Sequence, residues 1–139
     1  MIRNLIWTMM FFMLFFQLSL AETCPSIRDI KNGRLHAWQL YDSDNHKQLN
    51  VIHMTQFKKY AQQFTLAEWQ ENDIKHNTIR CYYRDLNGSE ATAYLARNDF
   101  YPNSTNETWY VVSGSMHCAA GREQCSFQQK TSPPQLAKK

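Results

Sequence analysis

TIRCYYRDLNGSEATAYLAR, residues 78–97, is the stretch of sequence that decides the fold. Residues 78–84 and 90–97 are rich in β-favouring side chains that alternate between two faces, which predicts two strands. Asn87 and Gly88 lie between them and suit the two positive-φ positions of a tight hairpin turn. The side chains expected on one face are Ile79, Cys81 and Tyr83 in the first strand and Ala91, Ala93 and Leu95 in the second. The stretch therefore predicts a central antiparallel hairpin.

Shorter patterns on both sides of this hairpin predict a mixed α+β domain. Pro25 fits the first position of a short helix that runs through Ile30, and Gly33 fits its end. The further elements expected are a strand over residues 35–41 with His36, Trp38 and Leu40 on one face, a polar turn at 42–45, a loop at 98–107 and a final strand at 109–112.

Residues 54–70 allow two interpretations. Apolar residues recur at helical spacing from Met54 to Ala67, whereas residues 64–69 could equally form a strand. Thr65 and Glu68 also match a capping box, which would begin a new helix. We favour a helix over residues 54–62 followed by a strand over residues 63–70.

An apolar leader precedes the domain. Arg3 is the only charged residue before Glu22, residues 5–20 are almost entirely apolar, and Ser19 and Ala21 are the small residues expected at a cleavage site. The sequence predicts a signal peptide over residues 1–21, a single domain over 22–127 and a disordered polar tail over 128–139. We therefore expect a secreted or periplasmic protein without stable membrane insertion after cleavage.

The four cysteines are predicted to form disulfides, because their number is even and the compartment is oxidising. Four cysteines allow three pairings. Gly121 would let the short segment between Cys118 and Cys125 turn back, so we favour a local Cys118–Cys125 bridge and a long Cys24–Cys81 bridge. The predicted fold class is α+β: a small antiparallel sheet, a meander or hairpin, with one or two short helices, cross-linked by disulfides.

No motif in the sequence fixes a reaction, a metal site or a cofactor. His117 beside Cys118 suggests a thiol catalyst, but neighbours on a strand point to opposite faces and a structural disulfide is the better explanation. The five histidines lack metal-ligand spacing. Asp42 and Asp44 begin like a calcium loop that then lacks the required glycine and glutamate. We therefore predict no catalytic residue, no metal and no cofactor.

Carboxylates provide the remaining enzymatic alternative. Glu68 together with Glu90 or Asp99 could act in acid–base hydrolysis if the fold brought two of them together in a cleft. Ordinary surface charge explains the same residues more simply.

The aromatic residues are the clearest functional indication. If one face of the sheet is open, Tyr82 and Tyr94 lie on the side opposite Cys81, beside Arg80 and Arg84. Tyrosine and arginine dominate the energetics of protein-binding surfaces, although solvated strand faces also carry them. We predict these four residues as a binding surface.

Several stretches resemble small secreted proteins of unknown function from Legionella-type gammaproteobacteria. The residues that carry the resemblance are Cys24-Pro25, Trp38, the stretch from Ile79 to Arg84, and Met116-His117-Cys118-Ala119-Ala120-Gly121 with Cys125. The resemblance implies a periplasmic or exported, disulfide-cross-linked domain, and it implies no catalytic residues.

These observations together favour a secreted or periplasmic, non-catalytic protein-binding module. Its partner is expected to be a protein of the cell envelope or of a host. The formal net charge of +3 over 139 residues is too balanced to indicate a nucleic acid or an anionic membrane. The alternatives are a small secreted hydrolase that uses carboxylates and a structural accessory subunit of an envelope assembly.

Overall fold

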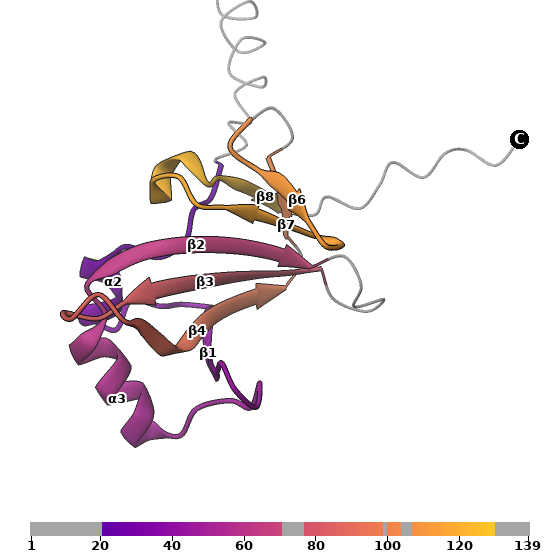
Figure 1. The fold of residues 1–139 in the computed structure, drawn as a ribbon. Helices are drawn as coiled ribbons and strands as arrows, with labels where there is room; N and C mark the ends of the chain where they lie inside the picture. Colours follow the sequence, from indigo (N-terminus) through magenta and orange to yellow (C-terminus); the bar gives the residue numbers. More distant parts are fainter. Residues whose placement is uncertain (1–20, 71–76, 99, 104–106, 130–139) are drawn as a thin grey trace, which may run out of the picture.

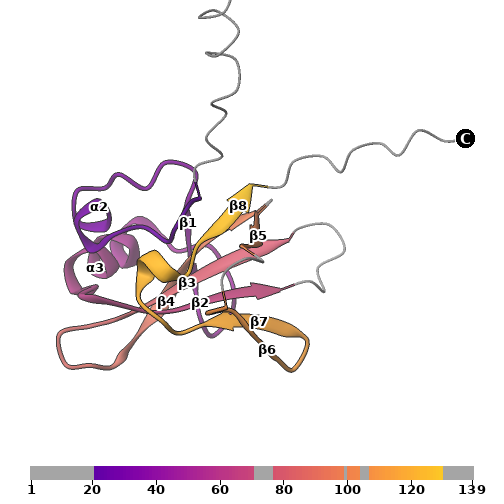
Figure 2. The same cartoon turned by 90° about the horizontal axis from the view of Figure 1, so that it is seen from above.

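A computed structural model describes residues 21–70, 77–98, 100–103 and 107–129. They form a six-stranded sheet in the order β1-β4-β3-β2-β7-β6 and a two-stranded sheet, β5-β8, with two short helices. Figure 1 shows the larger sheet and the helices, and Figure 2 shows β5 beside β8. Every pairing between strands is antiparallel. The predicted antiparallel α+β class with disulfides is confirmed, but the main sheet is larger than the small hairpin or meander we expected.

The bounds of the elements follow the chain. The helices are α2 (Ile27–Lys31) and α3 (Val51–Tyr60), with a 3-10 turn η1 (Arg122–Gln124). The strands are β1 (Gln39–Asp42), β2 (Gln63–Gln70), β3 (Thr78–Arg84), β4 (Glu90–Asn98), β5 (Phe100–Pro102), β6 (Tyr110–Val112), β7 (Ser115–Cys118) and β8 (Phe127–Gln129).

The central hairpin forms where the sequence predicts it, but its turn differs. Only Gly88 has a positive φ, of 78°, and Asn87 does not. The connection is the longer segment 85–89, in which the Asp85 carboxylate accepts hydrogen bonds from the backbone N–H groups of Asn87 and Ser89. The aspartate side chain thus closes a wider loop, for which one left-handed residue is sufficient.

The N-terminal segment departs from the prediction at His36. The helix begins after Ser26, whose hydroxyl accepts a hydrogen bond from the Asp29 N–H, so Pro25 precedes the cap. Residues 35–38 form a turn and not a strand, because His36 adopts a φ of 48° and is exposed. The turn allows Leu35 and Trp38 to be buried together, an arrangement that a regular strand would not permit.

The ambiguous segment 54–70 resolves into the helix and strand that we favoured. The helix α3 begins three residues earlier than expected, capped by the Asn50 side chain, which accepts from the His53 N–H. The capping box at Thr65 and Glu68 is not used, because β2 runs through both residues. Thr65 instead lies at a register shift between Phe64 and Leu66. Strand alternation places Ala67 and Trp69 in the core and Glu68 on the opposite face.

The C-terminal third contains strands that the sequence pattern did not reveal. β5 lies inside the expected loop 98–107, and Tyr110–Val112 is followed by β7 and β8, so it is not the final strand. β8 also includes Gln128 and Gln129, which we assigned to the polar tail. The remainder of that tail and the leader 1–20 lie outside the described residues. Among the described residues, no helix is long and apolar enough to cross a membrane.

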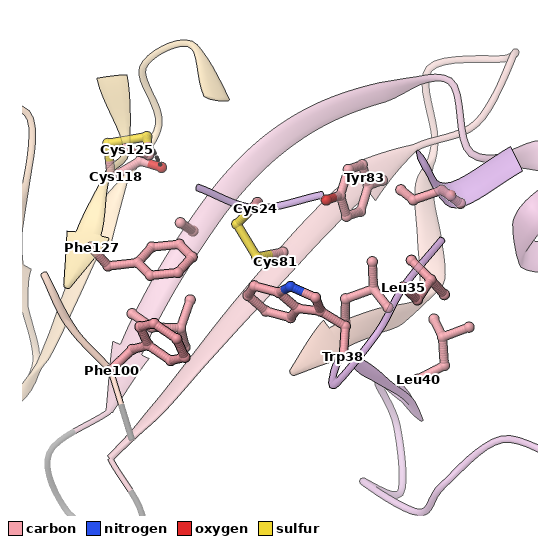
Figure 3. Close-up of a cluster of buried hydrophobic side chains, with 14 of the residues drawn as sticks. Cys24, Leu35, Trp38, Leu40, Cys81, Tyr83, Phe100, Cys118, Cys125 and Phe127 are labelled. Atoms are coloured by element: carbon pink, nitrogen blue, oxygen red, sulfur yellow. Dashed lines mark hydrogen bonds between the residues drawn. A yellow bond between two sulfur atoms is a disulfide. The ribbon is translucent and has the colours of Figure 1, made fainter. Parts of the chain in front are cut away.

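One face of the six-stranded sheet, here called the core face, packs against the helices and the β5-β8 sheet. Ile79, Cys81 and Tyr83 of β3 are fully buried on this face, as the alternation predicts. Trp38, Phe100 and Phe127 lie near the Cys24–Cys81 disulfide in Figure 3, with edge-on contacts between their rings. Figure 2 shows α2 and α3 close together, away from the β6-β7 hairpin.

Both disulfides have the pairing that the sequence favoured. Cys24 is bonded to Cys81 and Cys118 to Cys125, and all four side chains are fully buried. The first bridge joins the N-terminal segment to the central strand β3, and the second closes the loop that contains η1. The Tyr83 hydroxyl donates a 2.7 Å hydrogen bond to the Pro25 carbonyl beside the first bridge, which fixes the same segment a second time.

Candidate functional site

The face of the sheet opposite the core, here called the outer face, carries one row of side chains across all six strands. Cα partners in adjacent strands place their side chains on the same face, so the row can be followed through the register. It runs Gln39 (β1), Ala96 (β4), Arg80 (β3), Glu68 (β2), His117 (β7) and Tyr110 (β6). A second, shorter row beside it runs Tyr41, Tyr94, Tyr82 and Leu66.

Glu68 lies in the middle of the first row and is the hub of its charges. One carboxylate oxygen lies 3.1 Å from His117 Nε2, and the other lies 3.6 Å from an Arg80 terminal nitrogen. The Gln70 amide donates a further 2.9 Å hydrogen bond to Glu68. Only 14% of the Glu68 side chain is exposed, so its charge depends on these neighbours more than on water.

The contacts of His117 do not form a catalytic relay. Ser115 Oγ lies 3.1 Å from His117 Nε2, the same nitrogen that faces Glu68. A serine–histidine–carboxylate relay requires the serine and the carboxylate on different ring nitrogens. The Ser115 hydroxyl also donates to the Val112 carbonyl, so its proton is directed away from the imidazole. The three residues form a structural hydrogen-bond network.

Arg80, Tyr82 and Tyr94, three of the four residues that the sequence predicts as a binding surface, form one cluster on the outer face. The Arg80 guanidinium carbon lies 5.1 Å from the centre of the Tyr94 ring, and the two tyrosine rings lie 5.4 Å apart. Burial raises the pKa of the Tyr82 hydroxyl, and the negative charge of Glu68 raises it further. The positive charge of Arg80 opposes this shift. Burial likewise raises the pKa of Tyr94.

Tyr94 supports this cluster from below and exposes little surface of its own. Only 3% of it is exposed, because Tyr41 stacks on its ring and His46 covers it from the loop after β1. The Tyr94 hydroxyl lies 3.0 Å from His46 Nδ1. The main role of Tyr94 is therefore to hold Arg80 in place.

A hollow of about 540 Å³ opens beside this cluster. Its lining includes Arg80 and Tyr94 together with side chains from β1, the ends of β3 and β4, the loop after β1, and the β5-β8 sheet. These are Ala37, Gln39, Tyr41, His46, Thr78, Ala96, Arg97, Asn98, Phe100 and Gln129. We call it the Ala96 hollow, since Ala96 lies between Gln39 and Arg80 in the row.

Arg84, the fourth predicted binding residue, does not line the Ala96 hollow. It is exposed at the far end of β3 and lines a separate hollow with Thr65, Arg122 and the loop 119–121. Register shifts on both sides of β3 separate it from Tyr82. The predicted four-residue surface is therefore split between two sites.

The register places Glu68 and Glu90, two carboxylates of the hydrolase alternative, at different points along β3. Glu90 is the Cα partner of Arg84, whereas Glu68 is the partner of Arg80, four residues away along β3. Four strand residues span about 13 Å of backbone. Asp99 lies outside the described residues. Glu68 is held by Arg80 and His117 and not by a second carboxylate.

The remaining candidates have structural explanations. Cys118 is buried in its disulfide on the core side, while His117 belongs to the outer row, so the two side chains point apart. The Asp42 carboxylate accepts from the backbone N–H groups of Asp44 and Asn45, and these hydrogen bonds lower its pKa. Among the described residues, no three His, Cys, Asp or Glu side chains gather as metal ligands would.

Sequence reasoning missed the residues that complete the site. Alternation along residues 63–70 was sufficient to place Glu68 opposite Trp69, but the contact with His117 depends on β2 pairing with β7, which no local pattern reveals. Tyr41 and His46 reach Tyr94 through the pairing of β1 with β4.

Comparison with protein families, curated proteins and solved structures found no match.

Proposed function

We propose that this protein is a secreted or periplasmic, non-catalytic module that binds another protein through the outer face of its sheet. The observation that carries the proposal is the Ala96 hollow, where Arg80, Tyr41 and His46 meet at a recess. Arginine and tyrosine set around a recess are the residues that contribute most to protein-binding energy.

The supporting framework is rigid, and rigidity favours binding. The Arg80 side chain is held by Tyr94 beneath it and by the Glu68 charge beside it. Strand β3, which carries Arg80, is joined by a disulfide to the N-terminal segment. A surface that is ordered before binding loses less conformational entropy when a partner docks.

The two buried disulfides support the proposed compartment. Disulfides form and persist in secreted and periplasmic proteins, whereas the cytosol keeps thiols reduced. All four cysteines of the chain are bonded. This agrees with the predicted signal peptide over residues 1–21, which remains a prediction.

Site-specific photo-crosslinking in the producing cell tests the proposal. A photoreactive residue at Gln39, exposed at the rim of the hollow, is expected to capture one protein, whereas the same residue at Lys59 on α3 is not. Mass spectrometry identifies the captured protein.

Two variants decide whether the capture is specific. Arg80→Gln should abolish capture at Gln39, and Arg84→Gln should leave it unchanged, because Arg84 lines the other hollow. The proposal is wrong if no protein is captured, or if the captured protein is retained by Arg80→Gln in a folded state.

A further inference from the structure

We infer that the Ala96 hollow receives a carboxylate, so that the partner presents an aspartate or glutamate side chain there. The identity of the ligand as part of a protein rests on the proposed function. The preference for a carboxylate rests on the hollow alone, through its shape, its donor groups and its charge.

The shape of the hollow comes from a small residue in a row of large ones. Ala96 lies between Gln39 and Arg80 on the outer face and has no side chain beyond Cβ. The flanking side chains stand at the sides and Ala96 forms the floor between them. A ligand group can therefore approach Arg80 at the level of the strand.

The amide groups around the hollow are left with their donors available. The Tyr41 hydroxyl donates to the oxygen of the Gln39 amide at 2.9 Å. The Thr78 hydroxyl donates to the oxygen of the Asn98 amide at 3.0 Å. Each bond uses one of the two lone pairs of the amide oxygen, and the NH₂ groups of Gln39 and Asn98 are the donors that these amides present. The lining thus favours a ligand rich in acceptors.

Two arginines line the hollow, and the carboxylate that each of them faces lies outside its lining. Arg80 and Arg97 both line it, and its described lining contains no aspartate or glutamate. The 3.6 Å separation between Arg80 and Glu68 is too long for a hydrogen bond. Arg80 Nε is buried without a hydrogen-bond partner among the described residues, so only the terminal nitrogens of Arg80 can reach a ligand. Arg97 keeps one terminal nitrogen on Glu22 at 2.9 Å. The terminal nitrogens of Arg80 are therefore the charged donors that it offers to the hollow.

The planar guanidinium sets the class of ligand. Arg80 lies over the Tyr94 ring and Arg97 over the Phe100 ring, which orients both groups at the hollow. Planar, oriented guanidinium groups pair with two oxygens of a carboxylate or of a phosphate, and of these two groups the carboxylate is the one that unmodified protein side chains carry. The other hollows do not combine these features: one is lined by Asp42 and Asp85, and in the other Arg122 is already bonded to Thr23 and the Cys24 carbonyl.

Titration by two-dimensional NMR tests the inference with two probes of equal size. Acetyl-glutamate-amide should shift the Ala96 and Asn98 backbone signals and the Gln39 side-chain amide signals, with a dissociation constant on the order of millimolar. Acetyl-glutamine-amide, which lacks the charge, should cause no saturable shift. Raising the salt concentration should weaken the glutamate complex.

Three variants locate the site. Arg80→Gln should weaken binding of acetyl-glutamate-amide by about tenfold or more, since a charged donor is lost. Ala96→Leu should abolish it by filling the floor, whereas Thr92→Leu, exposed on the same strand but lining another hollow, should leave it unchanged. If Ala96→Leu does not fold, Arg80→Gln and the salt dependence still decide the question.

The outcomes separate this inference from the proposed function. Equal shifts from both probes, or none from acetyl-glutamate-amide, would overturn the carboxylate preference even if a protein is captured at Gln39. Saturable, Arg80-dependent binding of acetyl-glutamate-amide without any captured protein would support the carboxylate site and overturn the protein partner. A free organic acid would then be the ligand.

Discussion

The two faces of the six-stranded sheet are built by the same strands and differ in almost every property. On the core face, Tyr83 and Leu95 are fully buried around the Cys24–Cys81 bridge. On the outer face, the alternate positions of β3 and β2 carry Arg80 and Glu68, whose contacts are ionic. Strand alternation separates a face that holds the fold from a face whose polar groups are arranged around a hollow. Changes on the core face should therefore act mainly on stability, and changes around the Ala96 hollow on the outer face should act mainly on binding.

Removing the disulfides should have the largest effect on the core face. The double variant Cys24→Ala/Cys81→Ala should lower the free energy of unfolding by about 4 kcal/mol, and Cys118→Ala/Cys125→Ala by about 2 kcal/mol, because the first bridge closes a much longer loop. The bridges span 57 and 7 residues respectively. Urea unfolding of both variants measures the difference. Equal losses would show that loop length does not govern the contribution of either bridge.

A single truncation on β4 should distinguish the buried position from an exposed one. Leu95→Ala should cost about 3 kcal/mol of unfolding free energy, because it leaves a cavity among fully buried neighbours. Thr92→Ala, exposed on the same strand, should change stability by less than about 0.5 kcal/mol. Thermal unfolding followed by circular dichroism compares the two. A small effect of Leu95→Ala would mean that the core around β4 closes over the gap.

The Glu68 network should contribute moderately to stability although it lies on the outer face. Glu68→Gln removes the countercharge of Arg80 and the partner of His117, and should cost about 1–2 kcal/mol after allowing for solvent screening. Glu123→Gln is the matched control, because Glu123 is 86% exposed and its pair with Arg122 should contribute less than about 0.5 kcal/mol. Urea unfolding at neutral pH is sufficient. Similar small losses of unfolding free energy in both variants would show that the Glu68 network contributes no more to stability than an exposed ion pair does.

The smallest effect concerns one hydroxyl on the core face. Tyr83→Phe removes the hydrogen bond to the Pro25 carbonyl and should cost about 1 kcal/mol at neutral pH. Burial raises the pKa of Tyr83, so the folded protein keeps a proton that the unfolded chain releases above pH about 10. Wild-type stability is therefore full below that pH and falls as the pH rises above it.

The same variant should flatten this alkaline decline. Tyr82 and Tyr94, whose pKa values are also raised by burial, should retain part of it. Unfolding free energies measured at neutral pH and at several values above pH 10 give the slope. An identical slope in Tyr83→Phe would assign the decline to other groups.

The alternation of apolar and polar residues was sufficient to predict the elements whose structure depends on residues close together in the sequence. The hairpin of β3 and β4 and the strand β2 were found because alternation and turn residues lie within one short stretch. The turn at His36 was missed because its positive φ is imposed by burying Leu35 and Trp38 together, which is a tertiary effect. β5 and β8 have three residues each and pair across a gap in the chain, so neither carries a periodic signal of its own.

The candidate site shows the same division. Arg80, Tyr82 and Tyr94 could be placed on one face from the alternation of two strands. The hollow beside them could not be foreseen, because its floor is an alanine that looks unremarkable in the sequence and its walls come from β1, the loop after β1 and the β5-β8 sheet. Arg84 follows the alternation of β3 and is exposed, but it lines a different hollow, because register shifts beside β3 set it apart from Tyr82.

The long reach of the Cys24–Cys81 bridge also sets an order of events during synthesis. Cys24 emerges first and its partner follows 57 residues later, after α2, β1, α3 and β2 have been made. Until then the N-terminal thiol is available to any other cysteine or oxidant that it meets. The opposite holds at the other end, where Cys125 follows Cys118 by only seven residues. A cell that makes this protein in quantity therefore has to protect the Cys24 thiol until Cys81 has been made. A catalyst of disulfide formation should be needed mainly for the bridge that contains Cys24.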